Sequence, residues 1–482
     1  MAVVPRVVVG APSSGHGKTA VAVGLLAAYA GRGLPAAGFK IGPDFTDAAY
    51  LGLAAGRPGR NLDPQLVGAS RLAPLFAHGS AGAEIAIIEG AMGLFDSLSG
   101  WAEGDSTADV AVALRAPVVL VIDVAAMGQS VAALVHGFRV YDELLRLGGV
   151  ILNRVASDRH EQLLRQALDD IGVPVLGALR RGDLAVALPS RRHGAVPALQ
   201  RAVAAARGVR RLGEVVAAGI DLDRLLALAR SAPALAVEPW SPEPGHGPVP
   251  AGTRRPVVAL AGGPGGFYSY AEHAELLSAA GAAVALVDPL RDEQLPPGAA
   301  ALVVGGGLPE SCIEDLAANR RLCAAVADLA RAGRPVLAEG AGLLWLIQQH
   351  DGRPMCGVLD ATGVTGDRAV VGYRDAAAQA STVVGRLGNR LVGYRRHRAV
   401  VAPRAGRTPA WTWNGAPEGF VWRGVHASLL TLHWVGASEI ARRLVVAAQT
   451  PGEALLAPRQ SAPVLRAAHA EPVERESTEA VE

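Results

Sequence analysis

Lysine is almost missing from this sequence of 482 residues, although basic residues are common. Of the 46 lysines and arginines, only Lys18 and Lys40 are lysines, and both lie in glycine-rich segments. Lysine carries a compact ammonium charge, whereas the guanidinium of arginine is a planar fork, so the two are not interchangeable. We therefore expect the chemistry of these two lysines to be required, at a site that binds phosphate.

Other absences exclude whole classes of protein. The three cysteines, Cys312, Cys323 and Cys356, lack metal-ligand spacing and are too few for a disulfide framework. The net charge is only +2, and no basic run interleaved with aromatic residues indicates nucleic-acid binding. No apolar stretch is long enough for a membrane span, and no signal peptide opens the sequence. We expect a cytoplasmic protein that binds neither nucleic acid nor membrane.

The length predicts two domains, and a proline-rich segment separates them. Residues 238–256 contain six prolines and three glycines, which is typical of a linker between domains at 1–237 and 257–450. Residues 468–482 read as a disordered acidic tail. Short apolar runs alternate with helical patterns in both halves, which predicts an α/β protein with two doubly wound parallel sheets. The runs are Val7–Val9, Ile85–Ile88, Val118–Ile122 and Val150–Leu152, then Val257–Ala261, Ala285–Val287, Ala301–Val304 and Pro335–Ala338.

The first apolar run leads through a loop of small residues into a helical pattern, which is the context of a P-loop. Backbone N–H groups of this loop would hold the phosphates of ATP, Lys18 would reach the γ-phosphate, and the Thr19 hydroxyl would bind Mg²⁺. The loop residues expected around the nucleotide are Ser14, Gly15 and Gly17. Pro12 stands where the strict motif has glycine, so an ordinary strand-to-helix turn is the alternative reading of this motif alone.

Charged residues follow further predicted strands, where ligands of a parallel sheet are expected to lie. Lys40 is followed by Asp44 and Asp47, and Glu89 ends the run that begins at Ile85. Carboxylates at such positions can complete a Mg²⁺ shell with the P-loop hydroxyl, and Glu89 and Asp47 are the candidates. Asp44 and Asp47 could instead serve as turn or N-cap carboxylates.

Several segments together resemble one family, the cobyrinic or hydrogenobyrinic acid a,c-diamide synthases. They are Ala11–Thr19, Phe39–Asp44, Gly59–Asp63, Ile88–Asp96, Gly149–Val155 and Leu188–Arg191. The resemblance implies a P-loop ligase domain similar to dethiobiotin synthetase, followed by a class I glutamine amidotransferase domain. It also implies two ATP-dependent amidations, of the c and then the a acetate side chain of a corrin ring in cobalamin biosynthesis, through acyl phosphates. Lys40 would hold the carboxylate or the γ-phosphate. Asn153 would face the adenine, unless it is only a polar strand-end residue.

The second half departs from the family pattern at the glutaminase site. The family has a cysteine nucleophile where this sequence has Gly340, and the histidine that would activate it is replaced by Thr431. Arg395 stands where the family has a carboxylate, and His433, which remains, is expected to serve packing. Nucleophile and base act as a unit, so we expect this domain not to hydrolyse glutamine.

Three hypotheses therefore stay open. The chain could be a working ligase that takes ammonia from solution or from a partner glutaminase. It could be a non-catalytic or repurposed nucleotide-binding paralogue, or the partner subunit of an intact enzyme. It could also amidate a different carboxylate. A homodimer is expected from the general habit of α/β enzymes.

Overall fold

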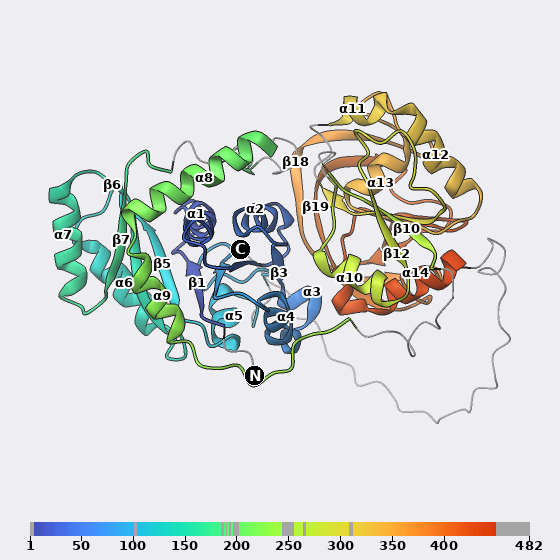
Figure 1. The fold of residues 1–482 in the computed structure, drawn as a ribbon. Helices are drawn as coiled ribbons and strands as arrows, with labels where there is room; N and C mark the ends of the chain where they lie inside the picture. The colour runs from blue at the N-terminus through green and yellow to red at the C-terminus, as the bar shows by residue number, and fades with distance from the viewer. Residues whose placement is uncertain are drawn as a thin grey trace, which may run out of the picture.

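A computed structural model describes residues 4–100, 104–184, 188, 190–191, 194–195, 202–242, 255–263, 267–307 and 312–449, and Figure 1 shows them as two neighbouring domains. The N-terminal domain is built on a seven-stranded sheet of order β3-β2-β4-β1-β5-β6-β7, in which every pairing is parallel. Its strands are β1 (Arg6–Gly10), β2 (Ala36–Ile41), β3 (Arg60–Leu62), β4 (Ile85–Glu89), β5 (Val118–Asp123), β6 (Leu147–Val155) and β7 (Val175–Arg180).

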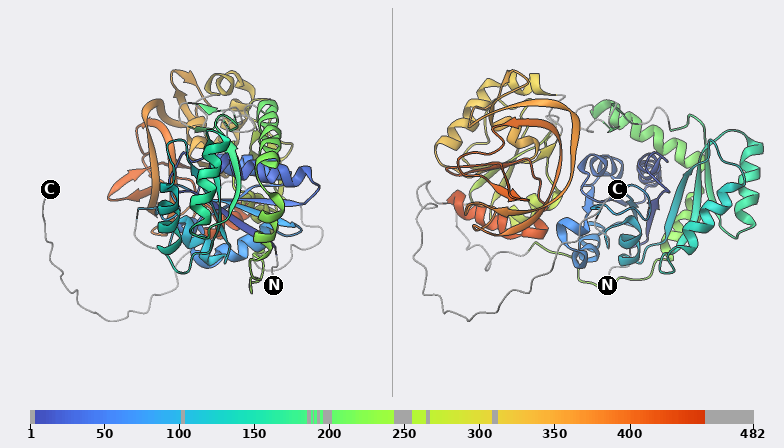
Figure 2. Two further views of the ribbon diagram at one scale, coloured as in Figure 1. Left: turned by 90° about the vertical axis from the view of Figure 1, so that its left-hand side faces the viewer. Right: turned by 180° about the vertical axis from the view of Figure 1, so that it is seen from behind.

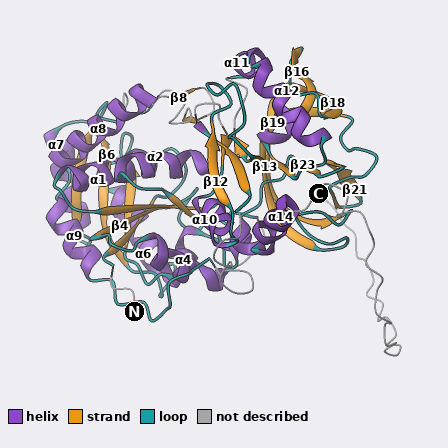
Figure 3. Cartoon of the chain, turned by 45° about the vertical axis from the view of Figure 1, so that its right-hand side comes forward, coloured by secondary structure: helices purple, strands orange, loops and turns teal. Residues whose placement is uncertain are grey.

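Helices cover both faces of this sheet, as Figure 3 shows. One face carries α1 (Lys18–Gly31), α2 (Phe45–Ala55), α8 (Ala202–Gly219) and α9 (Leu222–Arg230). The other carries α4 (Leu72–Gly79), α5 (Thr107–Ala113), α6 (Ser130–Val140) and α7 (Asp158–Asp169). Short elements complete the domain: α3 (Pro64–Val67), η1 (Ala69–Arg71), β8 (Ser190–Arg191) and β9 (Gly194–Ala195).

The central strand β1 shows why this sequence forms a two-faced sheet. Val7 and Val9 pack with α1 and α8, whereas Val8 points to the opposite face, and none of the three is exposed. Alternate side chains of a strand point to opposite faces, so a continuous apolar run fits a strand with helices on both sides. The carboxyl ends of β1, β2 and β4 consequently meet at one edge of the sheet, which is where the site lies.

The C-terminal domain contains a second parallel sheet, of order β12-β10-β13-β15-β23-β22, with only the edge strand β22 antiparallel. Its strands are β10 (Val257–Ala261), β12 (Ala283–Val287), β13 (Ala299–Val304), β15 (Val336–Glu339), β22 (Phe420–Trp422) and β23 (Val425–Ser428). The helical elements are α10 (Ala271–Ala279), α11 (Ile313–Ala318), α12 (Arg320–Arg331), α13 (Ala341–Leu346), η5 (Trp434–Ala437) and α14 (Glu439–Gln449). The predicted α/β class with two parallel sheets is confirmed.

A third sheet, which the sequence did not predict, extends from the C-terminal domain toward the N-terminal domain. Two long antiparallel strands, β18 (Leu359–Ala378) and β19 (Arg390–Ala402), stand at the side that faces α2 in Figure 1, and Figure 2 shows them from behind. The smaller strands are β16 (Ile347–His350), β17 (Arg353–Pro354), β20 (Trp411–Trp413) and β21 (Ala416–Glu418), with β11 (Phe267–Tyr268) and β14 (Gly306–Gly307) as a separate pair.

The two domains share a packed and hydrogen-bonded interface. One apolar cluster runs from Val8 in the N-terminal sheet to Leu444 in α14. The buried Tyr373 hydroxyl donates to Asp63 Oδ2 at 2.8 Å, and Arg60 pairs with Glu272 at 2.6 Å. Because these polar groups are buried and partnered across the boundary, the contact contributes to the stability of both domains.

The segment between the domains is only partly described. Residues 238–242 and 255–256 contain neither helix nor strand, but Trp240, inside the predicted linker, lies edge-on against His78 with ring centroids 5.0 Å apart. The predicted acidic tail at 468–482 lies outside the described residues. Within the part of the chain that the structure describes, no helix is both long and apolar enough to cross a membrane.

Candidate active site

The P-loop connects β1 to α1 at the carboxyl edge of the N-terminal sheet. Gly15 and Gly17 have φ values of 91° and 101°, in the left-handed region where glycine carries no Cβ penalty. Gly17 caps α1, so Lys18 and Thr19 begin the helix, and their backbone N–H groups have no partners within the helix and are available to a ligand. The Lys18 ammonium donates to the carbonyls of Ser13, at 3.0 Å, and of Met92.

The second lysine is the centre of a buried charge cluster. Lys40 Nζ lies 2.7 Å from Glu89 Oε1 and 2.8 Å from Asp47 Oδ2. The Thr19 hydroxyl donates to the same Glu89 oxygen at 2.5 Å, which joins the P-loop to β4. Lys40 and Glu89 are 5% and 0% exposed, so the cluster is removed from water and its charges act strongly on any ligand.

Burial and pairing separate the acidities of the two lysines. Burial, with a contribution from Lys40, lowers the pKa of Lys18 to about 8. Burial acts in the same direction on Lys40, but Asp47 and Glu89 outweigh it and raise its pKa above the usual value. Burial raises the pKa of Glu89 to about 7 against the effect of Lys40. Lys40 is thus a fixed cation, while Lys18 and Glu89 titrate near neutrality.

Asp44 links this cluster to the C-terminal domain. Its Oδ1 accepts from the N–H groups of Thr46 at 2.7 Å and Asp47 at 3.1 Å, so it is the N-cap of α2, as the alternative reading of the sequence expected. Its Oδ2 pairs with Arg396 of β19. Burial acts to raise the pKa of Asp44, but Arg396 and Lys40 outweigh it and lower the pKa. One carboxylate therefore caps the helix and binds the other domain.

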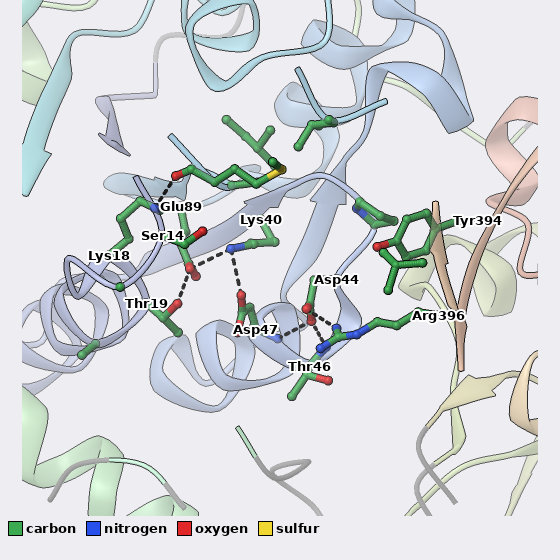
Figure 4. Close-up of a pocket in the computed structure, with 18 of the residues that line it drawn as sticks. Ser14, Lys18, Thr19, Lys40, Asp44, Thr46, Asp47, Glu89, Tyr394 and Arg396 are labelled. Carbon is green, nitrogen blue, oxygen red and sulfur yellow. Dashed lines mark hydrogen bonds and ion pairs between the residues drawn. The ribbon is translucent and has the colours of Figure 1, made fainter. Parts of the chain in front are cut away.

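These side chains line a cavity of about 670 Å³ between the domains, shown in Figure 4. Of the predicted site residues it includes Ser14, Gly15, Gly17, Lys18, Thr19, Lys40, Asp44, Asp47 and Glu89. The opposite wall comes from β18 and β19, through Tyr373, Tyr394 and Arg396. These three residues were not predicted from the sequence, in which the dense arginines of residues 395–398 are the signal for this segment.

Asn153 stands beside the P-loop but does not line this cavity. Its Nδ2 donates to the His16 carbonyl at 2.8 Å, while its Oδ1 is buried and has no hydrogen-bond partner in the described residues. An unpartnered buried amide oxygen fits a nucleobase amino group. The expected adenine contact remains a prediction.

The residues present also fit a divalent cation. Glu89 Oε2 is buried and, within the described residues, has no hydrogen-bond partner, which is costly for a carboxylate oxygen unless a ligand binds it. The Thr19 hydroxyl and Asp47 lie at the same cluster, and oxygen donors of this kind suit Mg²⁺. Glu89, Thr19 and Asp47 are the residues that would hold it.

The turn at which the glutaminase nucleophile was expected, which we call the elbow, contains Gly340. Gly340 lies between β15 and α13 with φ 52° and ψ −117°, a conformation typical of a strained strand-to-helix turn. A Cβ at this position would lie 3.0 Å from Gly306 Cα and 3.0 Å from Thr431 Oγ1. The structure thus places Gly340 and Thr431 face to face, where a nucleophile and its base were expected, and neither side chain can form a thiolate–imidazole pair.

His433 and Cys356 are both buried, and His433 also makes polar contacts: its Nδ1 accepts from the Val435 N–H at 3.4 Å and its Nε2 lies 3.7 Å from Glu272 Oε2. His433 is 2% exposed, and its ring stacks on Tyr270 with centroids 4.2 Å apart. Cys356 is buried in the same apolar cluster as Cys323 and Trp345, in the segment that follows β17. Burial holds the pKa of the Cys356 thiol well above its usual range, which disfavours a thiolate.

Comparison with known proteins agrees with this two-domain arrangement. Residues 7–195 match the CobQ/CobB/MinD/ParA nucleotide binding domain, and residues 266–433 match the CobB/CobQ-like glutamine amidotransferase domain. The chain is 50% identical to the hydrogenobyrinate a,c-diamide synthase of Streptomyces coelicolor, over 93% of this chain and 98% of that protein. The chain belongs to the a,c-diamide synthase family.

Two further members show how wide this similarity is. The hydrogenobyrinate a,c-diamide synthase of Thermobifida fusca is 46% identical, over 93% of this chain and 98% of its own length. The cobyrinate a,c-diamide synthase of Gloeobacter violaceus is 36% identical, over 91% of this chain and 96% of that protein. The family resemblance drawn from the sequence motifs is therefore confirmed.

In this member of the a,c-diamide synthase family, Arg395 is also removed from acid–base work. Its guanidinium donates to His397 Nε2 and lies 5.4 Å from the centre of the Trp413 ring. Burial, followed by the charges of Arg374 and Arg404, lowers its pKa, although Glu418 acts against this. Arg395 lines a separate cavity, together with Arg374, Arg404 and Trp413.

Proposed function

We propose that this chain is an ATP-dependent amide ligase that converts the a and c carboxylates of hydrogenobyrinic or cobyrinic acid to primary amides in cobalamin biosynthesis. The observation that carries the proposal is the buried cluster of Lys40, Asp47, Glu89 and Thr19 beside the P-loop. A nucleotide-binding module without catalysis has no need to maintain two buried charges, Lys40 and Glu89, with the partly buried Asp47, at this cost in desolvation.

The reaction follows from the weakness of a carboxylate as an electrophile. A carboxylate oxygen attacks the γ-phosphorus of ATP, the bond to the β-phosphate oxygen breaks, and ADP leaves. Ammonia then attacks the acyl carbon, phosphate departs with the bonding electrons, and the nitrogen loses a proton. Lys18 and the P-loop N–H groups stabilise charge on the transferring phosphoryl group, and Lys40 orients the carboxylate. Mg²⁺, held by Glu89, Thr19 and Asp47, would neutralise phosphate charge when bound.

We propose that the nitrogen source is ammonia and that the C-terminal domain of this chain does not produce it from glutamine. Gly340 supplies no nucleophile and Thr431 supplies no base, so a γ-glutamyl thioester cannot form at the elbow. Ammonia would come from solution or from a partner glutaminase. The C-terminal domain still contributes Tyr373, Tyr394 and Arg396 to the ligase cavity, which gives a reason for its retention.

The test compares two nitrogen donors. Purified protein is incubated with Mg-ATP and hydrogenobyrinic or cobyrinic acid, with glutamine in one series and ammonium chloride in the other, and products are separated by mass. We expect the diamide with ammonium chloride only. Diamide formed with glutamine would contradict the assignment of an inactive glutaminase.

A second candidate function, a nucleotide-binding partner subunit without catalysis, is favoured by the loss of both functional groups at the elbow. The same experiment decides between the two. Binding of ATP without product from either donor would support the partner subunit and exclude the ligase.

A further inference from the structure

A second cavity, of about 590 Å³, lies in the antiparallel sheet and belongs to neither catalytic centre. We call it the arginine pocket; its charged side chains are Arg374, Arg390, Arg395, Arg404 and Asp375. Trp413 and the turn at Asn414 and Gly415 form its floor. Asn414 and Gly415 have φ values of 48° and 72°, which matches the tight turn that joins β20 to β21.

The charges of the arginine pocket are not balanced. Asp375 pairs with Arg390 at 2.6 Å, but among the described residues Arg374, Arg395 and Arg404 have no ion pair within 4 Å. Glu418, behind the pocket, accepts instead from Ser428 Oγ at 2.6 Å and the Leu429 N–H at 2.8 Å. Four arginines stand against Asp375 and the nearby Glu418, so positive charge is in excess, and an anionic ligand would relieve the repulsion between the guanidinium groups.

Two of these arginines are held in place without a carboxylate. The guanidinium carbons of Arg395 and Arg404 lie 5.4 Å and 5.5 Å from the centre of the Trp413 ring. Trp413 is 7% exposed, so its ring is a fixed surface rather than a mobile side chain. Arg395 is further restrained by its contact with His397 Nε2 at 2.8 Å, which leaves the N–H groups of its other terminal nitrogen for a ligand, and planar guanidinium groups suit carboxylates.

The arginine pocket adjoins the ligase cavity. Tyr373 lines both cavities, and it is paired across the strands with Tyr394. Successive side chains of β19 alternate between them, because Arg395 lines the arginine pocket and Arg396 lines the ligase cavity. Because Tyr373 belongs to the walls of both cavities, a ligand with several carboxylates that extends around this residue would reach both sites.

We propose that the arginine pocket binds carboxylates of the tetrapyrrole substrate that are not reacting, while one acetate side chain occupies the ligase cavity. The inference rests on the proposed function, because a corrin acid whose a and c groups become amides carries further carboxylates. The pocket is then a specificity determinant, since it selects polycarboxylates over acids with a single carboxylate.

The test is a double variant, Arg374→Gln with Arg404→Gln, in the full chain. Neither residue lines the ligase cavity. The Michaelis constant for hydrogenobyrinic acid, measured with Mg-ATP and ammonium chloride, should rise about tenfold or more, because hydrogen bonds between charged groups contribute that much. The Michaelis constant for ATP should stay unchanged.

The affinity for hydrogenobyrinic acid alone, measured by calorimetry, should weaken by a similar factor in the double variant. Added sodium chloride should weaken the binding of this acid to the wild-type protein more than its binding to the variant.

The matched control is Arg407→Gln, which removes an exposed arginine outside the pocket and should leave both constants unchanged. If wild-type protein forms the diamide and the double variant keeps its Michaelis constant and affinity, the pocket assignment is wrong and the proposed function stands. If wild-type protein binds the acid but forms no diamide, the ligase proposal fails while the binding comparison still decides the pocket. Wild-type protein that neither binds nor amidates the acid overturns both.

Discussion

The two candidate catalytic centres of this chain differ in what they have kept. The P-loop centre has its loop geometry and its buried charges, with Lys40 2.7 Å from Glu89 and 2.8 Å from Asp47. The elbow has only its geometry: Gly340 keeps the positive φ of a nucleophile turn without a nucleophile. Backbone shape alone is therefore no evidence of activity, whereas buried charges that would be costly without a function are.

Under the proposed function, the C-terminal domain is retained without glutamine hydrolysis because it also forms a wall of the ligase cavity. Tyr373, Tyr394 and Arg396 reach the ligase cavity from β18 and β19, while Gly340 lies in the parallel sheet of the same domain. Selection on the ligase would preserve the first group of residues and not the second. Substitutions made separately at the P-loop centre and at the elbow test this difference between the two centres.

The largest effect is expected at the P-loop centre. Lys18→Ala or Glu89→Gln should abolish ATP-dependent amidation, at a cost of about 3 kcal/mol or more in transition-state stabilisation. In the proposed mechanism Lys18 contacts the transferring phosphoryl group, and Glu89, whose Oε1 accepts from the Thr19 hydroxyl, would hold Mg²⁺. Rates are measured with ammonium chloride, and thermal unfolding checks the fold. Either variant acting at the wild-type rate would show that the site is assigned wrongly.

A smaller loss is expected when the cross-domain ion pair is broken. Arg396→Ala leaves Asp44 without its partner at the cavity wall. We expect kcat/KM for ammonia-dependent amidation to fall about thirtyfold, which corresponds to a loss of about 2 kcal/mol in transition-state stabilisation. Arg396→Lys, which keeps the charge, should recover part of the activity. ATP affinity should not change, because the nucleotide contacts come from the P-loop.

The control for this variant is Arg398→Ala on the same strand, whose guanidinium donates to the Asp367 carbonyl at 2.7 Å and does not line the cavity. It should act as wild type. Equal losses in Arg396→Ala and Arg398→Ala would mean that the strand, and not the ion pair, is what matters.

Much of the P-loop centre could be predicted from the sequence, because its parts follow directly from local pattern. Glu89 ends one apolar run and Lys18 follows another through a loop of small residues, and parallel strands bring their carboxyl ends to one edge. Arg396 could not be predicted in the same way, since its partner lies 352 residues away and is met only when the domains pack. The strand β18 was missed because its burial follows no regular alternation and its sequence is rich in glycine and charge.

The pH dependence of ATP binding should separate the two lysines. Protonated Lys18 is the form that attracts phosphate, and its pKa in the free protein is about 8. Affinity should therefore fall as pH rises through this value, by about tenfold between pH 7.5 and 9. Lys40, whose pKa is raised, stays charged over this range. Calorimetric titration of ATP in the absence of the acid gives the constants.

Lys18→Arg serves as the control, because a guanidinium stays protonated throughout this range. Its ATP affinity is expected to be lower than that of the wild type but flat with pH. The same pH slope in wild type and variant would place the titrating group elsewhere.

The smallest effect is expected at the elbow. Gly340→Cys restores the nucleophile alone, and we expect no glutamine hydrolysis, since Thr431 cannot act as its base. The new Cβ would lie 3.0 Å from Gly306 Cα at a positive φ, so the free energy of unfolding should fall by about 1 kcal/mol. Ammonia-dependent amidation should be unchanged.

Gly340→Ser is the matched control, with the same strain and no thiol. Glutamate release by Gly340→Cys but not by Gly340→Ser would reveal a base other than Thr431 and make the elbow a dormant centre; release only after Thr431→His is added would show that both groups were lost.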